Sequence, residues 1–331
     1  MKLIIQIPCL NEAKTLPVTL KDIPKQIEGV DEVEVLVIDD GSTDNTSDIA
    51  RENGVQHILR LNRNAGLAYA FKLGIEESLR LGADIIINTD ADNQYDGSSI
   101  PDLIKPIINK EADIIIGNRE ILKAGRQGFI KGVLQFIGSW VVSRLSGLKI
   151  KDVTSGFRAF SREAAMKLNI VSDFSYTLET IIQAGEKGLV VKDVPVKTNG
   201  PLRKSRLFTS IFHYVQRSTA TIIKVYVAYE GFRVFVTTGA ILVSLGVLFV
   251  LRFLYFYVIG LNPSGHIQSL IIASILITVG FLVTMLGLLT DLVCSTRRIA
   301  EDILTKVREL EVDKKTGNPK PPVVIDIKQE E

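Results

Sequence analysis

Two long runs without a charged residue constrain this chain more than any other feature. The first contains the 18 residues between Arg233 and Arg252, and the second contains the 24 residues between His266 and Asp291. Each run is long enough to cross ~30 Å of hydrocarbon as a helix. We therefore expect residues 231–294 to form two transmembrane helices joined as a hairpin.

The basic residues around these runs predict which ends face the cytoplasm. Lys and Arg cluster before the first run (Arg203, Lys204, Arg206, Arg217, Lys224 and Arg233) and after the second (Arg297 and Arg298). No Lys or Arg lies between residues 253 and 266, so both ends are expected inside. The first residues do not read as a secretory signal, because a short apolar stretch ends at Asn11 and Glu12. We expect a two-pass protein of the cell membrane, with the part before the hairpin and the tail, 295–331, in the cytoplasm.

Charge and cysteine content exclude two classes of protein. The chain has 39 basic and 37 acidic residues, too even a balance for a protein that binds nucleic acid through a broad basic face. It has two cysteines, Cys9 and Cys294, which are too few for a disulfide framework or a zinc cluster. A reducing compartment and no nucleic-acid partner are expected.

Residues 1–200 have the pattern of an α/β domain. Short apolar runs alternate with stretches of helical period, which is typical of a mostly parallel sheet with crossover helices. The strand candidates are residues 3–8, 33–38, 56–60, 84–88, 113–117 and 189–194. Residues 66–81 repeat apolar side chains at helical spacing and are expected to be a crossover helix.

Two further stretches, 129–145 and 208–226, carry apolar stripes flanked by Lys and Arg. Such helices next to membrane spans are typical of the membrane interface, and ordinary core helices are the alternative. The second stripe defines an expected juxtamembrane segment, 201–230. The tail repeats apolar residues at helical spacing, and the sequence leaves open whether it packs on the domain or on another subunit of a homo-oligomer.

Polar motifs follow three of the expected strands. Pro8-Cys-Leu-Asn-Glu12 follows the first, and Asp39-Asp40-Gly-Ser-Thr follows the second. In an open parallel sheet, ligands bind beyond the carboxyl ends of the strands, where these residues fall. Asp39 and Asp40 can accept hydrogen bonds from base or ribose. The alternative is a turn at Asp-Gly with Ser42 or Thr43 capping the next helix.

The third motif is Asp90-Ala-Asp-Asn-Gln94, directly after an aliphatic strand. Mg²⁺ or Mn²⁺ prefers oxygen ligands, and with only one or two from the protein it keeps positions open for substrate phosphates. Asp90 and Asp92 fit this role, with a solvated acidic loop as the alternative.

These motifs, with Asn64-Ala-Gly66, resemble those of the family 2 glycosyltransferases with the GT-A fold, over residues 2–200. The resemblance implies a Rossmann-like, mostly parallel sheet in which strand-end acids hold the nucleoside and Asp-x-Asp binds a metal. The residues that it places at the nucleotide sugar are Pro8, Leu10, Asn11, Glu12, Ile38, Asp39, Asp40, Gly66, Asp90, Ala91 and Asp92. Gln94 joins Asp90 and Asp92 at the metal.

The acceptor is predicted to be a phosphate, because the sequence offers no acidic pair as a general base and has several arginines. Transfer to a hydroxyl needs a general base, and no acidic pair lies late in the domain, where Glu179 stands alone. A phosphate, with a second pKa of about 6, arrives already anionic. Three arginines can bind such an anion. Arg119 comes after an expected strand, Arg158 lies in a glycine-containing turn, and Arg203 is the first residue of the basic cluster that ends at Arg206.

This pattern is similar to that of the polyprenyl-phosphate branch of the family, which includes dolichyl-phosphate mannose synthase. The resemblance implies inverting transfer of a hexose from UDP or GDP to a dolichyl or undecaprenyl phosphate. Catalysis would rest on Asp90, Asp92, Gln94, Arg119, Arg203 and Arg206. The acceptor phosphate would meet Arg119, Arg126, Ser155, Arg158, Arg203, Ser205 and Arg206.

Two other functions fit parts of the sequence. A processive or hydroxyl-acceptor polysaccharide synthase shares the fold and the anchor, but Trp140 does not lie in the Gln-x-x-Arg-Trp motif of such enzymes. The chain could also be a non-catalytic scaffold that binds a nucleotide, but the intact Asp90-Ala-Asp92 motif argues against this function.

Overall fold

A computed structural model of the chain describes residues 1–119, 139, 142–143, 146–170, 176–200, 211–259 and 267–316. The chain divides into two compact units. One comprises residues 1–222 together with the C-terminal segment from Asp302, and the other comprises residues 223–301.

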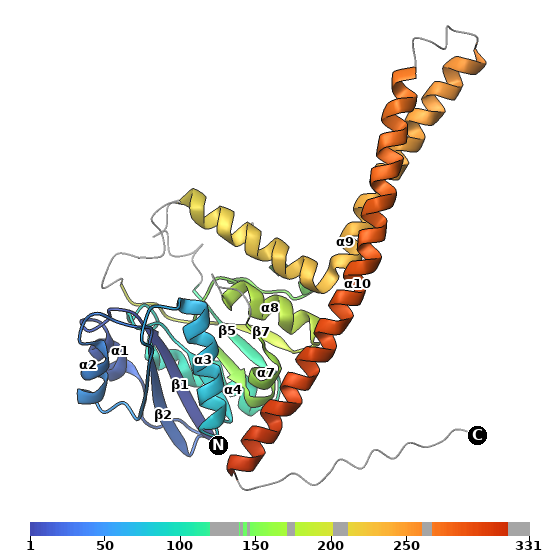
Figure 1. Cartoon of the computed structure of the whole chain (residues 1–331). Coiled ribbons are helices and arrows are strands. Elements are labelled where there is room, and N and C mark those ends of the chain that lie inside the picture. Colours follow the sequence, from blue (N-terminus) through green and yellow to red (C-terminus); the bar gives the residue numbers. More distant parts are fainter. Residues whose placement is uncertain are drawn as a thin grey trace, which may run out of the picture. The chain divides into compact units, whose positions relative to one another are not determined.

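The first unit is built on a seven-stranded sheet (Figure 1). Its strands are β1 (Lys2–Cys9), β2 (Glu32–Asp39), β3 (His57–Arg60), β4 (Ile85–Asn88), β5 (Ile114–Asn118), β6 (Arg158–Ser161) and β7 (Val191–Pro195). Their order in space is β3-β2-β1-β4-β6-β5-β7. All neighbouring pairs are parallel except those of β6, which runs antiparallel to β4 and β5. The expected mostly parallel α/β sheet is confirmed.

Strand β6 is the element that the sequence did not predict. It has only four residues and begins at Arg158, a residue type that is almost never fully buried unless it is paired. The structure places Arg158 at 0% exposure. The burial is possible because the guanidinium donates hydrogen bonds to the carbonyl oxygens of Val153, Ser155 and Thr177, and a local sequence pattern does not reveal the partner at Thr177.

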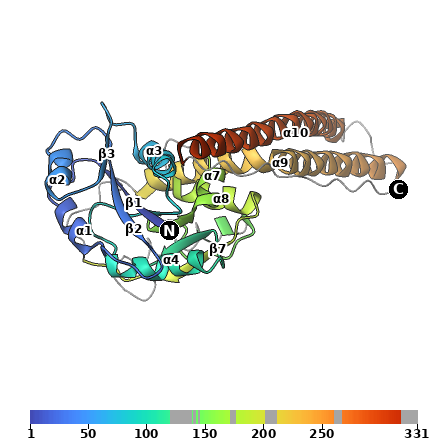
Figure 2. The same ribbon diagram turned by 90° about the horizontal axis from the view of Figure 1, so that it is seen from below.

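Helices cover both faces of the sheet (Figure 2). Buried aliphatic residues of β1, β2 and β4, such as Ile5, Val37 and Ile87, pack in one core with residues of α1, α2 and α4. Helices α3, α7 and α8 cover the other face. The bounds are α1 (Leu16–Asp22), α2 (Thr46–Glu52), α3 (Leu67–Arg80), the 3₁₀ turn η1 (Gly97–Ser99), α4 (Ile100–Ile108), α7 (Arg162–Lys167) and α8 (Tyr176–Glu186).

Helix α3 is the expected crossover helix, and it lies very close to the sheet. Its buried residues include Phe71, Gly74, Ile75 and Leu79, at the spacing of one helix face. A Cβ atom on Gly74 would lie 2.4 Å from the Gln6 side chain. Glycine at this position therefore allows the close approach.

The second unit consists of parts of two long helices, α9 (Ile211–Val258) and α10 (Ile267–Thr316). The backbone of α9 leaves helical geometry at Glu230 (φ −119°, ψ 25°). Segments Glu230–Val258 and Ile267–Arg308 are long and apolar enough to cross a membrane, and they contain both runs singled out in the sequence. The two helices approach closely through glycines, since a Cβ on Gly239 would lie 2.7 Å from the carbonyl oxygen of Gly280.

The expected interfacial stripes are only partly described. Residues 129–145 lie outside the described part of the chain except for 139, 142 and 143. Residues 211–226 are helical, but most of their side chains are not described. An interfacial position of both stripes stays a prediction.

The end of α10 belongs to the first unit, through Arg308. Its guanidinium donates hydrogen bonds to the carbonyl oxygens of Met166 (3.1 Å) and Leu168 (2.8 Å) and pairs with Glu76 (3.1 Å). Arg308 thus joins the end of α7 to α3. This part of the tail packs on the domain, while residues 317–331 lie outside the described residues.

Candidate active site

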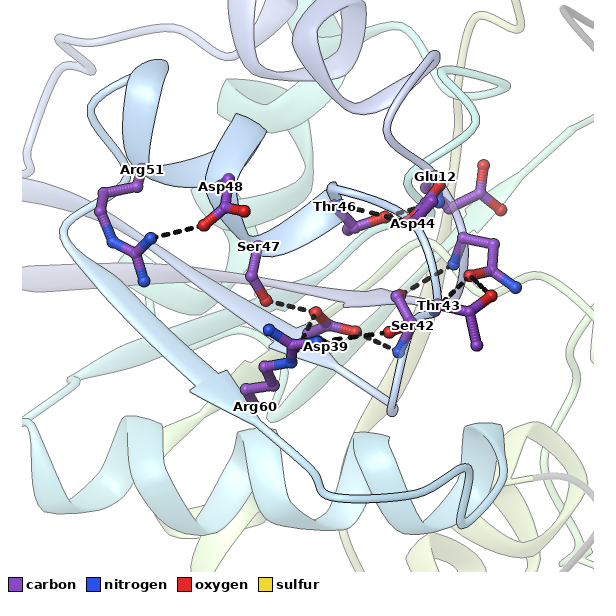
Figure 3. Close-up of polar contacts among 11 residues, drawn as sticks. Glu12, Asp39, Ser42, Thr43, Asp44, Thr46, Ser47, Asp48, Arg51 and Arg60 are labelled. Atoms are coloured by element: carbon purple, nitrogen blue, oxygen red, sulfur yellow. Dashed lines mark hydrogen bonds and ion pairs between the residues drawn. The ribbon is translucent and has the colours of Figure 1, made fainter.

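The loops after β1 and β2 form one structure (Figure 3). The amide of Asn11 donates to Ser42 Oγ (2.9 Å), and Asn11 Oδ1 accepts from the amide of Thr43 (2.8 Å). The amide of Glu12 donates to Thr46 Oγ1 (2.9 Å). Asn11 adopts a φ of +55°, a region that asparagine tolerates better than most residues. The first two sequence motifs therefore meet at the carboxyl edge of the sheet.

Asp39 shapes this edge from inside. Its side chain has no exposed surface and accepts hydrogen bonds from the Ser42 amide (2.8 Å) and the Ser47 hydroxyl. Arg60 lies 3.8 Å from the same carboxylate (Figure 3). Ile38 is also fully buried, and its Cδ1 atom would lie 2.9 Å from a Cβ atom on Gly74. Both residues support the predicted nucleotide site from beneath.

The helix cap expected at Ser42 or Thr43 is wrong. Helix α2 begins at Thr46, and Asn45 is its N-cap residue. Asp44 supplies the local hydrogen bonds instead, because its carboxylate accepts from the amide and the hydroxyl of Thr46.

Asp40 connects the end of β2 to the start of α3. Its two carboxylate oxygens accept from the amides of Ala65 (2.7 Å) and Gly66 (2.9 Å). Gly41, with φ +72°, lets the 63–66 loop approach, since a Cβ there would lie 2.5 Å from the carbonyl carbon of Arg63. Asp40 and the Asn64-Ala-Gly66 motif are therefore in direct contact.

The Asp-x-Asp motif follows β4 at the same edge. Asp90 and Asp92 are half-buried, and the buried Ala91 between them accepts a hydrogen bond from Thr19 through its carbonyl (3.0 Å). Asp92 Oδ1 accepts from the amide of Gln94 (3.2 Å). These bonds hold the turn that presents both carboxylates.

Two carboxylates on one turn are a suitable donor set for a hard divalent cation that takes its other ligands from a diphosphate. Among the described residues no group of three or more His, Cys, Asp or Glu side chains is placed to hold a metal alone. The chemistry of Asp90 and Asp92 fits Mg²⁺ or Mn²⁺ bound together with substrate.

Asp90 lies against the turn that precedes β6. A Cβ on Gly156 would lie 3.2 and 3.3 Å from the two Asp90 oxygens and 2.9 Å from the Tyr176 hydroxyl. Burial, and next the Asp90 charge, raises the pKa of Tyr176 well above its ordinary value. Burial likewise raises the pKa of Tyr95, with Asp90 adding to the effect. Both phenols therefore remain protonated.

Arg119 follows β5 and contacts Asp152 and Thr154, just before Gly156. Its Nε and Nη2 contact the Asp152 carboxylate at 2.7 and 3.0 Å, and Nη2 also donates to Thr154 Oγ1 (2.8 Å). Burial alone would lower the pKa of Arg119, but Tyr95, Asp152 and Asp90 outweigh it and raise the pKa. The guanidinium is thus a permanent cation close to Asp90.

Arg158 has no exposed surface to offer a phosphate. It donates to the carbonyl oxygens of Val153, Ser155 and Thr177 and to the Thr180 hydroxyl. Burial is the main cause that lowers its pKa to about 10. Its role in the described structure is to tie the 153–158 turn to α8. Ser155 is also fully buried.

The remaining predicted acceptor residues, Arg126, Arg203, Ser205 and Arg206, lie outside the described residues. The structure adds three residues at the site that sequence reasoning did not select: Asp152, Tyr95 and Tyr176. Asp152 and its neighbours follow Lys151 in a polar stretch without periodicity, so no local signal distinguished them.

Sequence comparison identifies relatives of this chain. Residues 4–168 match the family model described as Glycosyl transferase family 2. An uncharacterized protein of Methanocaldococcus jannaschii is 36% identical over 60% of this chain and 81% of its own length. Undecaprenyl-phosphate mannosyltransferase of Micrococcus luteus is 27% identical over 59% of this chain and 83% of its length. UDP-N-acetylglucosamine–dolichyl-phosphate N-acetylglucosaminyltransferase of Methanococcus voltae is 28% identical over 58% and 83%.

Structure comparison supports the fold. Glucosyl-3-phosphoglycerate synthase from Mycobacterium tuberculosis, solved with Mn²⁺, UDP and glucosyl-3-phosphoglycerate, superposes with a TM-score of 0.53 at 18% identity. The superposition covers 68% of this chain and 78% of that one. The likeness extends over the domain that carries the candidate site.

Proposed function

The chain belongs to glycosyl transferase family 2, and from this premise we propose that it transfers one hexose from a UDP- or GDP-linked donor to a polyprenyl phosphate. The reaction takes place at the cytoplasmic face of the cell membrane, with Mg²⁺ or Mn²⁺ as cofactor. The two apolar segments anchor the enzyme beside its lipid acceptor.

One observation carries the proposal. The half-buried carboxylate of Asp90 lies against the short turn of residues 152–158, and Asp152 of this turn forms a buried ion pair with Arg119. A carboxylate suited to a metal and a fixed cation at one turn would suit two anionic substrates bound next to each other. The names of relatives from Micrococcus luteus and Methanococcus voltae, both acting on polyprenyl-type phosphates, agree with this reading.

Each of these residues has a separate role in the proposed reaction. Asp90 and Asp92 would hold the divalent cation, which supplies positive charge to the leaving nucleoside diphosphate. Arg119 contacts the acceptor phosphate and offsets its repulsion from the donor. A phosphate oxygen then attacks the anomeric carbon as the bond to the diphosphate oxygen breaks, with inversion. A phosphate dianion needs no general base. Arg126, Arg203, Ser205 and Arg206 complete the proposed acceptor site.

The test uses the full chain in detergent with radiolabelled UDP- and GDP-hexoses, Mn²⁺ or Mg²⁺ and a short polyprenyl phosphate. We expect label in the organic phase as a monophosphate lipid that mild acid hydrolyses. Asp92→Asn should remove metal-dependent turnover, whereas Asp102→Asn, at an exposed position of α4, should leave it unchanged.

Label that stays in water or enters a polymer would contradict the phosphate acceptor and favour a hydroxyl acceptor. Glu179 is the candidate base that the sequence offers for that case. The structure places Glu179 at 1% exposure, with Gln183 donating to its carboxylate (3.1 Å), which is a poor position for a base.

A further inference from the structure

The peptide group of Gly156 lies between two buried tyrosine hydroxyls. The Gly156 amide donates to Tyr95 Oη (3.1 Å), and the Gly156 carbonyl accepts from Asn88 Nδ2 (2.8 Å) and from Tyr176 Oη (3.4 Å). Tyr95 and Tyr176 are 4% and 1% exposed. The main chain at Gly156 is therefore held on both sides.

The Asp90 carboxylate and the Tyr176 hydroxyl converge on Gly156. The position of a Cβ atom on Gly156 lies 2.9 Å from Tyr176 Oη and 3.2 and 3.3 Å from the two Asp90 oxygens. A side chain here would force the hydroxyl or the carboxylate to shift. Gly156 thus lets both groups lie against the same piece of main chain.

The Tyr176 hydroxyl is fixed in position. Its ring stacks on Phe71 with 3.9 Å between centroids and an interplanar angle of 5°. Its oxygen accepts a hydrogen bond from Asn88 Nδ2 (2.9 Å), and Gln6 Nε2 donates to Asn88 Oδ1 (2.9 Å). A stacked ring and an oriented amide leave the phenol little freedom.

The proton of this hydroxyl has a poor acceptor in the described structure. Its contact with the Gly156 carbonyl is 3.4 Å, whereas hydroxyl donors usually lie about 2.7–2.8 Å from the acceptor. A carboxylate is a stronger acceptor than a carbonyl, because hydrogen bonds to charged groups are shorter and stronger. The Asp90 carboxylate lies against the same glycine and, after burial, its charge helps to raise the pKa of Tyr176.

We propose that Tyr176 is a positioning residue for Asp90, and that its hydroxyl donates to the carboxylate and orients it for the divalent cation. The inference rests on the proposed function, in which Asp90 holds that cation. Partners of this kind, which hydrogen-bond to a metal-binding carboxylate, typically change metal affinity about 10- to 100-fold when they are removed.

The experiment measures metal binding without turnover. Full-length protein in detergent is titrated with Mn²⁺ in the presence of UDP, and free Mn²⁺ is followed by electron paramagnetic resonance. Tyr176→Phe keeps the ring that stacks on Phe71 and removes only the hydroxyl. We expect its Mn²⁺ affinity to fall about 10- to 100-fold. Tyr255→Phe, which removes an exposed hydroxyl from α9, should bind Mn²⁺ like the parent protein.

A second readout separates positioning from a general loss of structure. Turnover of Tyr176→Phe should recover at high Mn²⁺, with kcat close to that of the parent, whereas a damaged fold would keep turnover low at every Mn²⁺ concentration. Gly156→Ala is a second test of the same arrangement, because the new Cβ atom would displace the Asp90 carboxylate or the Tyr176 hydroxyl. It should weaken Mn²⁺ binding at least as much.

The outcomes separate the inference from the proposed function. Parent-like Mn²⁺ affinity in Tyr176→Phe, alongside lost binding in Asp92→Asn, would overturn the positioning role and leave the metal site standing. Absence of UDP-dependent Mn²⁺ binding in the parent protein would overturn both.

Discussion

Replacing Asp152 by asparagine is expected to destabilise the catalytic domain strongly. Asp152 makes two contacts with Arg119, at 2.7 and 3.0 Å, and the two side chains are only 3% and 13% exposed. Asparagine keeps the shape and removes the charge, so the buried guanidinium loses the counter-ion to which it is hydrogen-bonded. Breaking such a buried pair costs about 3–5 kcal/mol.

In a domain of this size, about 1 kcal/mol lowers the melting temperature by roughly 2–4 °C, so we expect a decrease of about 10 °C. Cys9 provides the assay, because it is a free thiol buried in β1. In a Cys294→Ser background, a thiol-reactive dye reports opening of the sheet through Cys9 alone.

Asp193→Asn is the matched control. Asp193 accepts one hydrogen bond from Asn118 (3.3 Å), and the structure describes no arginine ion pair for it. Its melting temperature should change by less than about 2 °C, as for most surface substitutions. The double variant Arg119→Met with Asp152→Leu should recover most of the lost stability without recovering turnover. An Asp152→Asn protein that melts within about 2 °C of its parent would refute the argument that Arg119 and Asp152 form a buried ion pair in which each charge needs the other.

Two other predictions concern stability. Burial opposes ionisation of Asp152, but the hydrogen bonds and charge of Arg119 outweigh it and hold its pKa below the ordinary value. The stabilisation is therefore present above about pH 4 and lost as the pH falls through the folded-state pKa. Thermal melts from pH 6 to 3 should show a smaller decline in Asp152→Asn than in the parent, and equal declines would contradict the assignment. Arg308→Ala removes bonds to Glu76 and to the carbonyl oxygens of Met166 and Leu168 at the end of α7, so about 2 kcal/mol should be lost and proteolysis of the 302–316 segment should quicken. Lys306→Ala, at an exposed position, is the control, and equal cleavage of both variants would exclude a docking role for Arg308.

The positions of the motifs were predictable because they depend on short-range patterns. Aliphatic stretches that lead into the polar residues Asn11, Asp39 and Asp90 are visible in the sequence, and parallel strands bring their carboxyl ends to one edge of a sheet. The uncharged runs predicted the two long apolar helices for the same reason, since length and composition alone decide which segments suit a hydrocarbon layer.

The role of each polar side chain was decided by tertiary structure. The sequence predicts that Arg158 contacts the acceptor phosphate, yet the residue is buried because carbonyl oxygens from two separate segments accept its hydrogen bonds. Arg308 finds Glu76, which lies 232 positions away along the chain. Tyr176 and Asp90 both lie against Gly156 only because β4, β6 and α8 pack around that residue. Periodicity and turn chemistry are properties of neighbouring residues, whereas the partner of a buried polar group depends on which distant segments the folded core brings together.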